Sequence, residues 1–267
     1  MLKKLAFRDI MIYESEAEDM EIYQLILIAV IAVAASCVQS ITGFGFGIVA
    51  MIFLPRLLLY TEANVLSSIL SALTSVLVIV VMWRKTSWKN LIFPLLSSIL
   101  MSYFATAFVK SAKNDVLMLL LGIALLALSA YFFFFSEKIK IRPTWYAGLI
   151  AGAISGVMGG LFSISGPPVV IYYLQSEKDT DRYMATLSMY FVCSGAVTVF
   201  MKAMFGFVTV NVLICLAIGL LGMVIGTLFG AKVRNKSNPK MIKKAVYAVM
   251  AMSGAVNIVS SLMSMLS

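Results

Sequence analysis

The sequence contains no histidine, few charged residues and only three cysteines, and each shortage excludes a class of protein. Without histidine, Ser-His and Cys-His catalysis and His-ligated metal or haem sites are unavailable. Cys37, Cys193 and Cys215 lie singly in apolar runs, without the spacing of a zinc or redox site. We therefore expect no enzymatic activity, no metal and no cofactor.

Charged residues make up only 12% of the 267 residues, whereas a soluble domain carries about 25%. Hydrophobic residues make up 61%, so the composition predicts an all-α polytopic protein of the lipid bilayer. The net charge of +9 would indicate a nucleic-acid partner in a soluble protein. Here the Lys and Arg residues stand in short gaps between apolar runs, so they are topology signals and we expect no nucleic acid.

Eight runs lack Asp, Glu, Lys and Arg, and each is long enough to cross about 30 Å of hydrocarbon. They are residues 22–55, 63–83, 90–109, 116–136, 143–176, 183–201, 203–231 and 245–267. The first and fifth runs have 34 residues each and begin 121 residues apart, which indicates a duplicated half. The sequence thus predicts a first repeat at 22–136 and a second at 143–267, after an N-terminal tail or interfacial helix at 1–21.

The two long runs are expected to break, because a helix of that length would extend about 51 Å. Glycines at positions 43, 45 and 47 interrupt the first run. The fifth run is interrupted from Gly159 to Pro168, where glycine and serine precede two prolines. Glycine loosens a helix and proline fits best at a helix start, so each long run is predicted to contain a turn followed by a new helix.

The distribution of basic residues favours long runs that form hairpins, so that each run enters the membrane and returns to the same side. If each long run crossed once, the two sides would carry 10 and 11 Lys and Arg residues; with returning hairpins they carry 7 and 14. The positive-inside rule then predicts a multi-pass protein of the plasma (inner) membrane with both termini extracytoplasmic. A hairpin plus three crossings is an odd number, so the second half would be inverted relative to the first, as in many transporters.

A returning helix that begins inside the membrane directs free N–H groups and a positive dipole end at its surroundings, which favours anions. Hydroxyl and amide side chains beside the two breaks would add donors. The predicted substrate-binding residues are Gln39, Ser40, Thr42, Gly43, Gly45, Gly47, Ser163, Ser165, Gly166 and Pro167. Glycine and serine in membrane helices also permit close helix packing, and that interpretation stands beside the functional one.

Two stretches resemble the repeated signatures of the TauE/SafE family of sulfite and organosulfonate exporters. They are SITGFGFG at 40–47, followed by Pro55, and GVMGGLFSISGPP at 156–168. The second departs from the usual pattern, because Ser163 and Ser165 stand where glycines are common. The resemblance extends from about residue 22 onward and implies a transporter of sulfite, organosulfonate, sulfoacetate, thiosulfate or a related small oxyanion.

Acidic side chains are absent from all eight runs, so a cation site built from carboxylates is not expected. Arg56, after the first run, and Lys202, between the sixth and seventh, are predicted to draw anions to an entrance; the alternative is that both extend to lipid headgroups. Hydroxyl and amide groups in other runs would line a cavity or join helices. They are Ser67, Ser68, Ser71, Thr74, Ser98, Ser102, Ser188, Ser194 and Asn257.

Three other functions compete with an alternating-access carrier of small anions. An anion channel would use the same donors without alternation. A soft-metal (copper) transporter would use the 18 methionines, although these are scattered and suit core filling better. A membrane scaffold for protein partners would need no site at all. The sequence leaves the transport direction, the coupling ion and a homo-oligomer open.

Overall fold

The computed structural model describes residues 21–134, 142–233 and 239–266, and these residues form helices without a strand. The long helices are α2 (Ile22–Thr42), α4 (Tyr60–Met82), α5 (Trp88–Ser111), α6 (Asn114–Phe134), α7 (Trp145–Phe162), α9 (Thr180–Met204), α10 (Val210–Val233) and α11 (Pro239–Leu266). Shorter elements are α3 (Phe46–Phe53), α8 (Gly166–Ser176) and the 3-10 turns η1 (Leu54–Arg56) and η2 (Trp83–Lys85). The predicted all-α fold is confirmed, whereas the segment expected at 1–21 lies outside the described residues except for Glu21.

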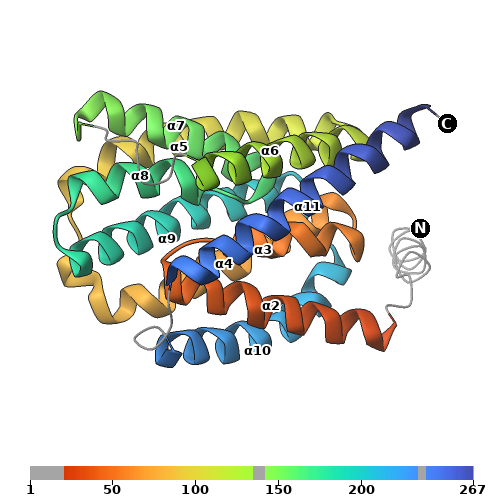
Figure 1. The fold of residues 1–267 in the computed structure, drawn as a ribbon, viewed down its shortest axis with the longest axis horizontal. Coiled ribbons are helices and arrows are strands. Elements are labelled where there is room, and N and C mark those ends of the chain that lie inside the picture. Colours follow the sequence, from red (N-terminus) through yellow and green to blue (C-terminus); the bar gives the residue numbers. More distant parts are fainter. Residues whose placement is uncertain (1–20, 135–141, 234–238, 267) are drawn as a thin grey trace, which may run out of the picture.

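Eight of the described helices are long and apolar enough to cross a membrane, in agreement with the eight predicted runs. They lie side by side along the long axis of the molecule (Figure 1). Many large apolar side chains, such as Val81, Leu96 and Leu221, are exposed on the outside of the bundle. An apolar outer surface is what a bilayer requires, so a multi-pass membrane protein follows from both length and surface.

Both long runs break where glycine and serine predicted a turn. The first gives α2 and α3, and the second gives α7 and α8. Each short helix packs back against the long helix before it. The first arms have 21 and 18 residues and the returning arms only 8 and 11, so the two arms of each hairpin are unequal.

Helix packing follows a two-fold pattern. Helix α2 packs on α10 as α7 packs on α5, while α4 packs on α9 and α6 on α11. Exchanging the first set of helices (α2 to α6) with the second (α7 to α11) therefore leaves these principal pairs unchanged. In Figure 1, α2 begins at the lower right of the bundle and α7 at the upper left.

Glycines bring the backbones of these helix pairs close together. A Cβ on Gly152 of α7 would overlap the carbonyl oxygen of Pro94 in α5, and one on Gly226 of α10 would overlap that of Val33 in α2. Small residues at helix contacts increase dispersion contact in lipid, where the hydrophobic effect contributes little. The packing interpretation therefore holds for these glycines, which lie outside the two breaks.

Local capping sets where the second-half helices begin. The Thr144 hydroxyl accepts a hydrogen bond from the Ala147 amide at 3.4 Å before α7, and the Asp179 carboxylate accepts one from the Arg182 amide at 2.9 Å before α9. Side-chain oxygens at this position satisfy amides that the helix itself leaves unpaired. From its cap, α9 continues for 25 residues and so includes Lys202 within its last turn.

Candidate anion site

The long helix before each break ends in the same backbone conformation, at positions 120 residues apart. Gly43 caps the C-terminus of α2 with φ of 84°, and Ser163 caps that of α7 with φ of 58°. The Gly43 amide donates to the Gln39 carbonyl, and the Ser163 amide donates to the Gly159 carbonyl. This left-handed conformation ends a helix readily when the residue is glycine, but it strains a residue with a Cβ. Ser163 is the only described residue other than glycine that adopts it.

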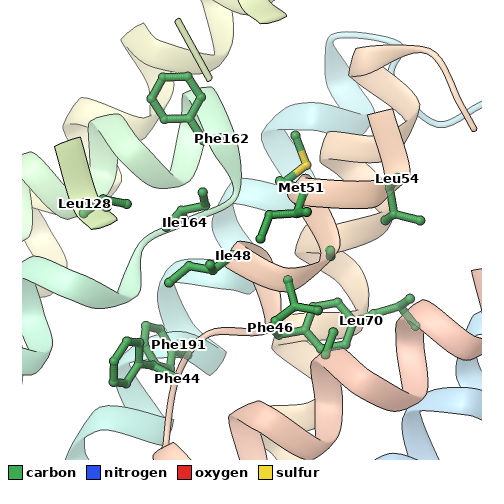
Figure 2. Packing of buried hydrophobic residues seen from close by; sticks show 14 of the residues in the cluster. Phe44, Phe46, Ile48, Met51, Leu54, Leu70, Leu128, Phe162, Ile164 and Phe191 are labelled. Atoms are coloured by element: carbon green, nitrogen blue, oxygen red, sulfur yellow. The ribbon is translucent and has the colours of Figure 1, made fainter. Parts of the chain in front are cut away.

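The breaks contact each other inside the bundle. A Cβ on Gly47 of α3 would overlap the Ser163 carbonyl oxygen and lie 2.8 Å from the carbonyl carbon. Likewise, a Cβ on Gly166 would lie 3.1 Å from the Cβ of Phe44. Apolar side chains of both breaks, including Phe44, Phe46 and Ile164, lie in the region where the breaks meet (Figure 2). The first turns of α3 and α8 therefore lie next to each other.

The Ser163 side chain holds the second break against α4. Its hydroxyl is 2.7 Å from the Ser68 hydroxyl, 2.6 Å from the Asn64 carbonyl oxygen and 3.1 Å from the Asn64 side-chain oxygen. Asn64 also donates from its amide nitrogen to the Leu161 carbonyl at 2.5 Å. The strained position thus receives several hydrogen bonds that a glycine there would lack.

Lys202 reaches the same cluster from α9 and is completely buried, with 0% of its surface exposed. Its ammonium group donates to Ser68 Oγ at 2.7 Å, to Ser163 Oγ at 3.0 Å and to the Gly159 carbonyl at 3.4 Å. All three acceptors are neutral. The ion pairs among the described residues, Lys85 with Asp181 and Arg182 with Glu177, do not include it.

The predicted position of Lys202 at an entrance was therefore wrong. In the sequence, Lys202 interrupts two apolar runs and so marks a boundary between them. The helix continues to Met204, so Lys202 faces the interior of the bundle. Arg56, the other residue predicted at an entrance, is exposed on η1, and its role there stays a prediction.

A cavity lined largely by hydroxyl groups lies beside this ammonium group. Its residues come from α4, α5, α7, α9 and the second break: Ser68, Ser71, Ala72, Ser98, Ser102, Ser155, Gly156, Gly159, Ser163, Ser165, Phe191, Ser194, Gly195 and Thr198. All three acceptors of the Lys202 ammonium are among them. The volume is about 30 Å³, which holds a water molecule. A ligand with several heavy atoms would therefore require the surrounding helices to separate.

A second, smaller cavity lies between the two breaks and collects most of the predicted site residues. Its lining includes Gln39, Gly45, Gly47, Ser163, Ser165, Gly166 and Pro167. The two cavities share Ser71, Ser163, Ser165 and Phe191. The first turns of α3 and α8 therefore face one polar region.

Three predicted site residues do not line either cavity. The Ser40 hydroxyl donates to the Thr227 carbonyl of α10 at 3.1 Å. The Thr42 hydroxyl donates within its own turn, to the Val38 carbonyl at 2.9 Å, and Gly43 packs against Met184. These residues shape the first break and attach it to neighbouring helices.

Gln39 lines the smaller cavity but its side chain is held by α4. Its amide nitrogen donates to Ser75 Oγ at 2.8 Å and to the Ser71 carbonyl at 3.2 Å, and its oxygen accepts from Ser71 Oγ at 3.2 Å. The corresponding residue 120 positions later is Gly159, which lines the larger cavity. The Gln39 side chain thus fills a position in the first half that has no side chain in the second half, because Gly159 stands there.

Several site residues were not singled out by the sequence. Ser155 donates to the Ser165 carbonyl and accepts from the Tyr190 hydroxyl at 2.7 Å, so it fixes the second break. Asn64 does the same from α4. Serine inside an apolar run was the available signal, but it does not distinguish a cavity from a helix contact. No cluster of three potential metal ligands (His, Cys, Asp or Glu) occurs in the described part of the chain.

Comparison with known proteins gives two matches. The family described as sulfite exporter TauE/SafE matches residues 27–257. A probable sulfite/organosulfonate exporter TauE of Cupriavidus necator is 24% identical over 233 residues, which cover 83% of this chain and 89% of the relative. No solved structure matches significantly.

Proposed function

Because this chain belongs to the sulfite exporter TauE/SafE family, we propose that it is a secondary transporter of small sulfur-containing oxyanions. The substrate class is that of sulfite, organosulfonates, sulfoacetate and thiosulfate. The observation that carries the proposal is the polar region where two helix starts and the serine-lined cavity meet. Hydrogen-bond donors without nearby carboxylates favour an anion.

In this proposal the oxyanion lies between the two breaks. Helix α3 contributes amides of its first turn at Gly47 and Ile48, which line the smaller cavity. Helix α8 contributes fewer amides, because Pro167 and Pro168 have no N–H, so the hydroxyls of Ser163 and Ser165 supply the remaining donors. Gln39 and the glycines at 43 and 45 hold the first break in place.

Transport is proposed to occur by alternating access between two inverted halves, residues 22–136 and 143–267. The shared geometry at Gly43 and Ser163 and the two-fold pattern of helix pairs support a duplicated architecture. The small volume of the cavity agrees with a conformation in which both halves are closed on the site. Movement of one half against the other would then open the site to each side.

The orientation belongs to the same proposal: a plasma-membrane protein with both termini outside the cytoplasm. A protease-cleavable tag on either terminus would be removed from intact cells if this is right. Protection of both tags in intact cells, with cleavage after permeabilisation, would reverse the orientation.

A flux measurement with purified protein in liposomes tests the function. We expect labelled sulfite or a small organosulfonate to leave loaded liposomes that contain the protein faster than it leaves protein-free liposomes. The double variant Ser163→Ala/Ser165→Ala should lose this flux while still inserting into the liposome membrane. Ser129→Ala is a matched control, because its hydroxyl only donates to the Tyr247 carbonyl at 2.8 Å, away from the site.

The competing functions give different results in the same system. A channel would produce steady anion conductance across a planar bilayer. A copper transporter would move Cu(I) but no oxyanion, and a scaffold would tolerate the double serine substitution. Any of these three results would overturn the carrier proposal.

A further inference from the structure

The described residues that surround the Lys202 ammonium group supply no acidic partner for it. Its three partners are two hydroxyls and a carbonyl. The nearest acidic residue along the contacting helix α4 is Glu62, six positions before Ser68 and therefore about 9 Å away along the helix axis. Glu62 accepts a hydrogen bond from the Thr209 hydroxyl at 2.5 Å. The charge is thus solvated by neutral oxygens but unpaired.

A buried ammonium group without a counter-charge is strongly unfavourable in a membrane interior. Such residues persist where they have a function, and their natural complement is an ion of opposite sign. The lining of the adjacent cavity contains no charged residue at all, either basic or acidic. A ligand in the polar region that the two cavities share would meet several hydroxyls, with the ammonium group directly behind the lining residues Ser68, Ser163 and Gly159.

The first half shows that this polar cluster is not needed to hold a break. Shifting by 120 residues relates Ser163 to Gly43 and Asn64 to Met184. Gly43 does contact Met184, with a Cβ at position 43 lying 3.0 Å from the methionine sulfur. The same shift relates Lys202 to Met82. The corresponding break is therefore built without the ammonium, which makes a purely structural role for Lys202 unnecessary.

From these observations we infer that Lys202 is a substrate-binding residue and that the site accepts oxyanions with a single negative charge. The inference rests on the proposed transport function and narrows its substrate class. One ammonium and one monoanion give a neutral pair, whereas a dianion would bring an uncompensated negative charge into the same enclosed cavity. Among sulfur oxyanions, the singly charged class comprises organosulfonates without a second acidic group and the protonated form of sulfite, whereas sulfoacetate and thiosulfate carry two charges.

Once the surrounding helices separate to admit such a ligand, the ammonium group needs to give up only one of its hydrogen bonds to contact it. Its longest hydrogen bond, at 3.4 Å, goes to the Gly159 carbonyl, which also lines the cavity. Exchanging this acceptor for a sulfonate oxygen leaves the bonds to Ser68 and Ser163 in place. The hydroxyls can then turn their protons toward the remaining oxygens of the anion.

Thermal unfolding of the purified full-length protein tests the preference for singly charged anions, here called the charge rule, without relying on transport. The probes are methanesulfonate, its neutral analogue methanesulfonamide and the dianion sulfate, compared at equal ionic strength. We expect methanesulfonate to raise the melting temperature in a saturable way, with at least tenfold weaker effects from the other two. Equal stabilisation by methanesulfonamide or by sulfate would overturn the inference.

Two variants assign the effect to the ammonium group. Lys202→Met copies Met82 of the first half and should lower the apparent affinity for methanesulfonate at least tenfold. Lys85→Met is the matched control, because Lys85 is exposed and paired with Asp181, and it should respond like the parent. An unchanged response of Lys202→Met would overturn the inference.

If Lys202→Met does not fold, Ser163→Gly supplies the second test, because it copies Gly43 and removes an acceptor of the ammonium. It should weaken methanesulfonate binding, and unaltered binding would again count against the inference. The proposed function fails separately: it falls if no oxyanion of either charge crosses the liposome membrane. Flux with equal preference for mono- and dianions would leave the transporter intact and refute the charge rule.

Discussion

Gly47 of α3 lies directly against the backbone of Ser163, so closely that the two breaks touch without any side chain between them. The contact joins the first turn of a helix in the first half to the end of a helix in the second. Rigid backbone on both sides leaves no flexible atom that could move away. The distance between the two breaks is therefore fixed by the absence of a side chain at position 47.

Replacing Gly47 with alanine should separate the breaks. The added Cβ would overlap the Ser163 carbonyl, and overpacking of this kind costs about 1–3 kcal/mol of folding free energy. We expect a lower melting temperature and at least a tenfold loss of flux. Gly206→Asn is a suitable control, because nothing lies within 4 Å of a Cβ there and asparagine tolerates its φ of 83°. A fully active Gly47→Ala protein would show that the breaks need not touch.

Two substitutions at Ser163 should separate backbone strain from hydroxyl chemistry. Both Ser163→Gly and Ser163→Ala remove the hydroxyl, but only glycine adopts the φ of 58° without steric strain. We expect both variants to lose anion-dependent stabilisation and the alanine variant to be less stable by about 1–2 kcal/mol. Chemical denaturation checks the difference; equal stability of the two variants would mean that this backbone conformation relaxes.

Gln39→Leu should loosen the first break from α4. The substitution removes hydrogen bonds to Ser71 and Ser75 and leaves buried partners unsatisfied, which costs about 1–3 kcal/mol. We expect reduced thermal stability and a changed transport rate, because the side chain borders the smaller cavity. If stability and rate both stay at the parent level, Gln39 does not join these helices in the membrane.

Alanine at Gly152 or Gly226 should weaken two equivalent helix contacts to a similar degree. In each case the Cβ would overlap a backbone carbonyl of the partner helix, α5 or α2. We expect each variant to lose about 1–3 kcal/mol of stability. Measurement of both unfolding midpoints in one detergent checks the two losses; an unchanged midpoint in either variant would show that the helix backbones at that contact can separate without cost.

The fold could be read from the sequence because its signals are local. Runs without charge set the spans, and glycine at 43 and 45 and proline at 167 mark the turns, where the helices do end and begin. The cavity between the breaks could be anticipated for the same reason, since free amides accompany every new helix start. Ser163 and Ser165 could be singled out as candidates because they stand beside the second turn in the sequence.

Lys202 could not be placed because its environment is set by distant residues. Its partners Ser68 and Gly159 are 134 and 43 positions away. A lysine near the end of a span usually extends to the headgroups, whereas the packing of α9 against α4, α5 and α7 encloses this one. Ser67 and Ser68 show the same difficulty: Ser68 binds the ammonium, whereas the Ser67 hydroxyl has no hydrogen-bond partner among the described residues.

The burial of one lysine has an electrical consequence for a transport cycle. If the ammonium stays charged, the protein with its singly charged cargo is neutral at the site, while the empty protein carries one positive charge. A membrane voltage acts on moving charge, with about 2.3 kcal/mol per elementary charge per 100 mV. The empty protein's return is then the voltage-sensitive step, and loaded movement proceeds alike in energised and de-energised membranes.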